Sequence, residues 1–138
     1  MLRTASLLVA ITMWLVSPTT AQGTLVFRGR PEVRIVEEGY DRSAKDLSSR
    51  LAPHYECVIS ESDGRYYWTS RENTELARHE DGTFITFVAT DGSGYIRVIA
   101  PGMKSAAALA SETGALFDYT EHLTRGLSTV TYYGKRSP

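Results

Sequence analysis

Short apolar runs alternate with polar positions through residues 55–100, and a polar, mostly glycine-containing turn separates each run from the next. The runs are rich in Tyr, Trp, Thr, Phe, Ile and Val, the residue types that fit a pleated, partly buried surface. Connections this short join neighbouring antiparallel strands. The pattern therefore predicts a meander of about five strands, which can curl toward a half-barrel as it twists. The runs are YECVISE, RYYWTSR, TELARHE, TFITFVAT and YIRVIA.

The turn residues indicate which strands pair. Asp81-Gly82 stands directly between two runs and is typical of a two-residue type I′ hairpin turn, in which both central residues have positive φ. Gly64 fits the left-handed position of a three-residue hairpin. Glu72-Asn73 is a weaker turn signal because it lacks a glycine. The run after Asp81-Gly82 is largely apolar on both faces, so we expect that strand to be covered on both sides.

Residues 41–51 have the spacing of a short helix before the meander. Asp41 is a good N-cap residue, because its carboxylate can accept the free amide protons of the first turn. Three apolar residues follow at the i, i+3 and i+7 positions of one stripe, namely Ala44, Leu47 and Leu51. We expect this stripe to pack on the sheet. Residues 22–38 contain two apolar pieces, TLVF and VRIV, which predict two short strands.

Two helices are expected after the meander. Residues 103–111 are rich in Ala and Leu, and residues 115–126 have an apolar stripe at Leu116, Tyr119, Leu123 and Leu127. Residues 127–133 alternate and predict a final strand, followed by a polar tail at 135–138. The predicted fold class is therefore α+β. An antiparallel meander has one helix before it and two C-terminal helices packed on the sheet.

The first 21 residues are typical of a secretory signal peptide. Arg3 precedes an apolar stretch over residues 5–16, and Pro18-Thr19-Thr20-Ala21 supplies small residues at the cleavage site. The stretch is shorter than the roughly 20 apolar residues of a membrane-spanning helix, which favours cleavage over a retained anchor. We therefore expect a secreted or periplasmic protein with no stable membrane anchor after cleavage. Residues 22–138 are expected to form a single domain.

The net charge bears on the class of partner, and the cysteine content bears on disulfides. The 138 residues have a formal net charge of −1, which argues against nucleic acid as a partner. Cys57 is the single cysteine, so an exported chain has no internal disulfide. We interpret Cys57 as a small buried core residue, and a reactive thiol is the alternative.

Asp118, Glu121 and His122 are the most suggestive group for chemistry. On a helix, Asp118 and His122 share one face, where a carboxylate and an imidazole can act as an acid–base pair. The same spacing also occurs on solvated helix faces, with Glu121 paired to Arg125. The sequence has no second cluster to complete a metal site and no nucleophile-elbow or phosphate-loop motif. We therefore expect no metal or other cofactor.

A group of aromatic residues is a candidate surface for binding a partner. Tyr66, Tyr67 and Trp68 are consecutive, so strand alternation prevents all three from facing inward. Together with Tyr95 they are candidates for a surface that binds a protein, peptide or sugar. The alternative is that these rings fill the core.

The most economical prediction is an exported, non-catalytic binding domain. One alternative is a hydrolase that uses Asp118, Glu121 and His122 in a concave pocket. The other is a carrier that holds a small apolar molecule between the curled sheet and the terminal helices.

Overall fold

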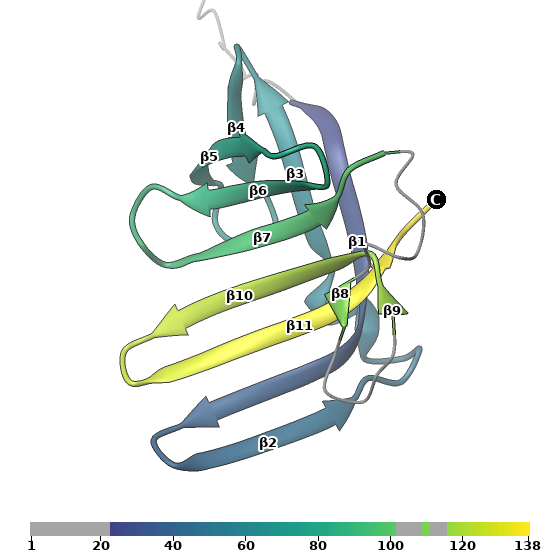
Figure 1. The fold of residues 1–138 in the computed structure, drawn as a ribbon, viewed down its shortest axis with the longest axis vertical. Helices are drawn as coiled ribbons and strands as arrows, with labels where there is room; N and C mark the ends of the chain where they lie inside the picture. Colours follow the sequence, from purple (N-terminus) through teal and green to yellow (C-terminus); the bar gives the residue numbers. More distant parts are fainter. Residues whose placement is uncertain (1–22, 102–108, 111–115) are drawn as a thin grey trace, which may run out of the picture.

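The computed structural model describes residues 23–101, 109–110 and 116–138, and this part of the chain is almost entirely β-structure (Figure 1). A nine-stranded antiparallel sheet closes on itself, and two further short strands pair with each other. The one other regular element in these ranges is a four-residue 3₁₀ helix, η1 (Ala52–Tyr55). The strands are β1 (Thr24–Glu38), β2 (Asp41–Asp46), β3 (Cys57–Ser62), β4 (Arg65–Trp68), β5 (Thr74–Glu80), β6 (Phe84–Ala89), β7 (Gly94–Ile99), β8 (Leu109–Ala110), β9 (Leu116–Phe117), β10 (Tyr119–Arg125) and β11 (Ser128–Arg136).

Eight of these strands form a closed barrel. Their spatial order is β1, β3, β4, β5, β6, β7, β10 and β11, and β11 pairs back on β1. The remaining strand, β2, extends the sheet as a hairpin with the second part of β1. In Figure 1 the β1–β2, β10–β11 and β6–β7 hairpins lie one above another with their tips on the same side.

Strand β1 closes the barrel because it pairs with different strands along its length. Its first part pairs with β3, from Thr24 to Gly29, and its second part pairs with β11. The register with β11 shifts between Pro31 and Val33. Proline has no amide proton for a ladder hydrogen bond, so an irregular position in the strand accommodates Pro31. The two predicted short strands of residues 22–38 are thus one long, bent strand.

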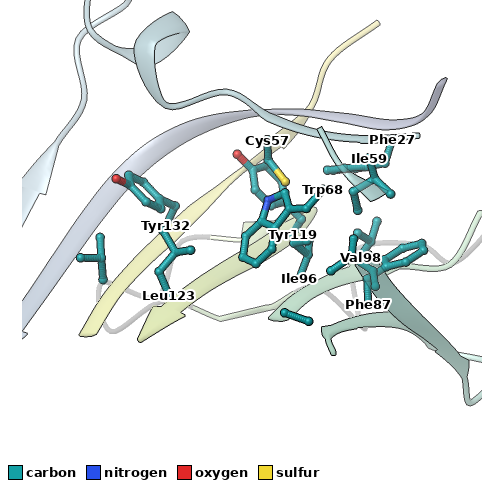
Figure 2. Close-up of a cluster of buried hydrophobic side chains, with 13 residues drawn as sticks. Phe27, Cys57, Ile59, Trp68, Phe87, Ile96, Val98, Tyr119, Leu123 and Tyr132 are labelled. Atoms are coloured by element: carbon teal, nitrogen blue, oxygen red, sulfur yellow. The ribbon is translucent and has the colours of Figure 1, made fainter. Parts of the chain in front are cut away.

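Alternation along the barrel strands fills the interior with side chains. Figure 2 shows these side chains converging on one cluster, with Trp68, Cys57 and Tyr119 near its middle. All eight barrel strands contribute to the cluster. The buried members of this cluster are Phe27, Cys57, Ile59, Trp68, Leu76, Phe87, Ala89, Ile96, Val98, Tyr119, Leu123, Val130 and Tyr132. A second, smaller cluster lies on the other face of β1 and β11 and consists of Val33, Ile35, Phe117 and Tyr133.

The predicted meander over residues 55–100 is present as β3 to β7, with details of the turns corrected. Asp63 and Gly64, not Asp81 and Gly82, form the two-residue turn with two positive φ angles, 52° and 76°. At the β5–β6 hairpin Gly82 is the first central residue, with φ 87°, and Thr83, the second, has no positive φ. A positive φ at the first central position only is the pattern of a type II′ turn, which needs glycine there. The carboxylate of Asp81 also holds this turn, because its Oδ1 accepts the amides of Thr83 at 3.1 Å and Phe84 at 2.8 Å.

The predicted α+β class is wrong, because residues 41–51 and 116–126, the described parts of two predicted helices, contain no α-helix. Residues 41–46 are strand β2, whose six side chains are all exposed. The Ala44–Leu47–Leu51 stripe does not pack as a unit, since Ala44 is exposed and Leu51 is 37 % exposed. The turn after Glu38, where Gly39 has φ 61°, returns the chain along the free edge of β1. Pairing with that edge outweighs the weak local helix signal.

In the second predicted C-terminal helix, 115–126, the described residues form β9 and β10. Tyr119 and Leu123 are four residues apart, a spacing that satisfies both a helical stripe and one face of a strand. The intervening Glu121 is also buried, so the true period is two. Gly126, with φ 59°, belongs to the β10–β11 hairpin turn and is not a helix end. The predicted helix 103–111 lies mostly outside the described residues, and its residues 109–110 form strand β8.

Two smaller predictions also change. The outer face of β6 is not covered, because Val88 is 38 % exposed there. The final strand is present but longer than predicted, and β11 continues to Arg136, so Lys135 and Arg136 belong to the barrel and not to a tail. The predicted signal peptide, residues 1–21, lies outside the described part of the chain.

Candidate functional site

Among the described residues, Glu121 on β10 has the one fully buried carboxylate, and its side chain has no exposed surface. Its Oε2 accepts a hydrogen bond from the indole Nε1 of Trp68 at 2.9 Å. Its Oε1 accepts one from Nη2 of Arg71 at 3.0 Å, and this contact is also an ion pair. A buried carboxylate is expensive unless it is paired and hydrogen-bonded, and these two donors provide both.

The turn between β4 and β5 places Arg71 beside the carboxylate of Glu121. Glu72 and Asn73 both have φ 56°, and the amide of Thr74 donates to the carbonyl of Arg71 at 3.2 Å. These are the features of a type I′ turn, formed here without glycine. The Arg71 side chain is 21 % exposed, and its guanidinium lies 5.7 Å from the centre of the Tyr132 ring.

Two further groups that can lose a proton lie in the same interior, Cys57 and Tyr119. Burial, followed by the negative charge of Glu121, raises the pKa of the Cys57 thiol well above its ordinary value. Burial also raises the pKa of Tyr119, whose hydroxyl is buried without a hydrogen-bond partner. A thiol acts as a nucleophile only as the thiolate. The arrangement therefore matches the predicted inert, buried Cys57 and gives no support to a reactive one.

The predicted acid–base group of Asp118, Glu121 and His122 is not brought together. Adjacent residues of a strand point to opposite faces, so Glu121 lies inside the barrel and His122 outside. His122 Nδ1 is 3.0 Å from Oγ1 of Thr131. Asp118 precedes β10, and its Oδ2 accepts the backbone amide of Arg136 at 2.8 Å. The predicted Glu121–Arg125 pair is likewise absent, because Glu121 binds Arg71.

The four aromatic candidates do not form one surface either. Trp68 is fully buried in the interior, and Tyr66 packs against Phe87 with ring centres 5.5 Å apart. Tyr67 and Tyr95 face outward on β4 and β7, which β5 and β6 separate. Tyr95 is 38 % exposed and stacks on the ring of His122 at 5.1 Å. Core packing therefore accounts for Trp68, and Tyr66 is partly buried against the core.

A pocket of about 210 Å³ opens at the end of the barrel where β1 begins and β11 ends. Seven barrel strands, β1, β3 to β7 and β11, contribute inward-facing or rim residues to it. Its apolar walls come from Phe27, Phe87, Val98 and neighbouring aliphatic residues. The full lining is Val26, Phe27, Glu61, Tyr66, Arg78, Ile85, Phe87, Val98, Pro101 and Arg136. We call this site the mouth pocket.

Three charged side chains line the mouth pocket, and they differ in their partners. Arg78 is paired with Glu80 at 2.9 Å. Arg136 donates from Nη2 to the carbonyl of Ile99 at 3.3 Å, and its guanidinium lies 5.2 Å from the centre of the Phe27 ring. Within the described ranges, neither Arg136 nor Glu61 forms an ion pair.

Tyr66, which the sequence predicts as part of an aromatic binding surface, lines this pocket, whereas the three charged residues of the lining were not predicted. Glu61 stands two residues beyond the buried Ile59, so alternation along β3 was an available signal that its side chain faces inward. Arg136 was missed because it was assigned to a polar tail. For Arg78, no local pattern in the sequence shows that its strand ends at a pocket.

Comparison with known proteins identifies no function for this chain. The chain matches no protein-family model, no curated protein and no solved structure. Over the residues that the structure describes, no helix has the length and apolar character to cross a membrane. The same residues contain no group of three or more His, Cys, Asp or Glu side chains placed to hold a metal ion.

Proposed function

We propose that this chain is a non-catalytic binding module that holds a small organic molecule in the mouth pocket. The observation that supports this is the combination of a barrel interior filled by side chains with a pocket at one end. The mouths of β-barrels are common ligand sites. Because Trp68, Tyr119 and Phe87 fill the middle, a ligand is confined to the rim and cannot lie beneath the sheet as in the predicted carrier.

The size and lining of the pocket indicate the kind of ligand. Pockets for drug-sized molecules are usually about 300–1,000 Å³, so 210 Å³ suits a smaller molecule. Apolar walls with a few polar groups at the rim favour a molecule with an apolar body and a polar end. The hydrolase alternative loses its support, because Asp118, Glu121 and His122 do not converge. We also retain export as a proposal, on the basis of residues 1–21 alone.

Titration with small neutral probes followed by ¹H–¹⁵N NMR tests the binding proposal. The probes are 1-hexanol, benzyl alcohol and cyclohexanol, added to the purified protein. We expect at least one probe to produce saturable shifts of amides lining the mouth pocket. Ile85→Trp fills the pocket from β6 and should abolish the shifts.

The matched control is Val88→Trp, which adds the same bulk to the outer face of the same strand. Shifts that saturate in Val88→Trp and disappear in Ile85→Trp support the proposal. Failure of all three probes to bind, or equal binding to both variants, would refute it.

A further inference from the structure

Arg136 is a cation with unused donors at the mouth pocket. Its guanidinium has five N–H donors, and the structure gives it one hydrogen bond, to the carbonyl of Ile99. Its backbone amide is fixed separately by the carboxylate of Asp118, and its guanidinium is held over the ring of Phe27. These contacts hold the side chain in place without neutralising it. Arg136 can therefore bind an anionic group at the rim of the mouth pocket, beside the ring of Phe27.

The other charged residues at the pocket restrict what that anion can be. Arg78 is neutralised by Glu80, so Arg136 is the one unpaired cation among the described lining residues. Glu61 lies on β3, on the other side of β1 from Arg136, and has no ion-pair partner in the described chain. An unpaired carboxylate repels a second negative charge on a ligand. The pocket therefore favours one anionic group over two.

Building on the proposed function, we propose that the mouth pocket binds a small monocarboxylate with an apolar body. The carboxylate binds the guanidinium of Arg136, and the apolar body lies against Phe87, Val98 and Ile85. Arginine and carboxylate match in geometry, since the planar guanidinium can donate two parallel hydrogen bonds. Glu61 discriminates against dicarboxylates of the same length.

Four probes of equal chain length test this proposal: hexanoate, 1-hexanol, hexylamine and adipate, each titrated into the purified protein by NMR. A hydrogen bond to a charged group corresponds to about a tenfold change in affinity. We expect hexanoate to bind about tenfold more tightly than 1-hexanol, and adipate and hexylamine to bind more weakly than hexanoate. Glu61→Gln should strengthen adipate binding.

Arg136→Gln should remove the hexanoate advantage and leave 1-hexanol binding unchanged, which also shows that the pocket is intact. The matched control is Lys135→Gln, which removes the same charge from the adjacent residue of β11 that faces the other way. Equal affinity for hexanoate and 1-hexanol, or equal loss of hexanoate binding in both variants, would overturn the monocarboxylate assignment. Binding of neither hexanoate nor any neutral probe would instead refute the proposed function itself.

Discussion

The carboxylate of Glu121 lies in the barrel interior with two donors and no exposed surface. Its partners differ in their access to water. Trp68 is fully buried, whereas Arg71 is 21 % exposed. Removing Arg71 leaves a buried charge with one neutral donor, while removing the charge of Glu121 leaves a guanidinium that can turn to water. The two halves of this ion pair should therefore have unequal effects on stability.

Arg71→Gln is expected to lower the free energy of unfolding by about 3 kcal/mol, in the range for breaking a buried pair. Glu121→Gln keeps the volume of the side chain and should cost less. Urea denaturation of both variants measures the difference. The control is Arg65→Gln, at an exposed position of β4. An equal, small loss in Arg71→Gln and Arg65→Gln would show that Glu121 does not depend on Arg71.

Cys57 should be unreactive toward a thiol reagent such as 5,5′-dithiobis(2-nitrobenzoate) until the protein unfolds, because its side chain is buried and its pKa is raised. The raised pKa of Cys57 also makes the free energy of unfolding depend on pH. Above about pH 8.5, the unfolded thiol loses its proton while the folded thiol keeps it. The folded state then binds more protons, so stability falls as the pH rises.

Urea denaturation between about pH 8 and 9.5 measures this slope. In Cys57→Ala the fall in stability over this range should be smaller, although tyrosines still contribute near the upper limit. Rapid labelling of the native protein, or identical slopes in both proteins, would contradict the burial of the thiol.

At the scale of the element, two glycines on adjacent strands form a slot for the ring of Tyr119. A Cβ atom at Gly29 on β1 would lie 2.6 Å from Cζ of Tyr119, and one at Gly134 on β11 would lie 2.7 Å from its Cε1. Gly29 is thus required by the close approach of β10 and not by a turn. The three strands meet where the barrel closes.

Gly29→Ala is expected to destabilise the protein by about 1–3 kcal/mol, the usual cost of overpacking a core. Thermal or urea denaturation measures this change. In a double-mutant cycle with Tyr119→Leu, the two losses should sum to more than the loss in the double variant, because the smaller side chain makes room for the new methyl group. Additive losses would show that Gly29 and Tyr119 do not share this slot.

The elements that sequence predicts well are those defined by local turns. The hairpins around Gly64 and Gly82 could be predicted because turn residues and two flanking apolar runs lie within a few positions of each other. The sequence predicts helices over residues 41–51 and 115–126 because Ala44, Tyr119 and Leu123 fit a helical spacing. Strand β2 is stabilised by pairing with β1, and β10 by pairing with β7 and β11, so the local side-chain pattern of either segment does not decide between helix and strand.

At the scale of the whole molecule, barrel closure depends on the pairing of β1 with β11, which no local sequence pattern predicts. Gly29 to Glu38 of β1 pairs with Ser128 to Arg136 of β11, which lies about a hundred residues later in the chain. Without that pairing, the predicted meander is an open sheet that needs helices to cover it. With it, the sheet covers its own apolar face, and Arg136, Phe27 and Glu61 reach one mouth. Closure thus explains why helices are wrongly predicted from the sequence and why the charged residues of the pocket are not predicted.

Interstrand nuclear Overhauser effects between β1 and β11 test closure most directly. Uniformly labelled protein should show backbone contacts from Ile35 to Thr131 and from Val36 to Val130, together with contacts between β10 and β7. Closure predicts all of these in one species. Sequential i to i+3 contacts through residues 115–126, with no contact between β1 and β11, would contradict the barrel and with it the mouth pocket.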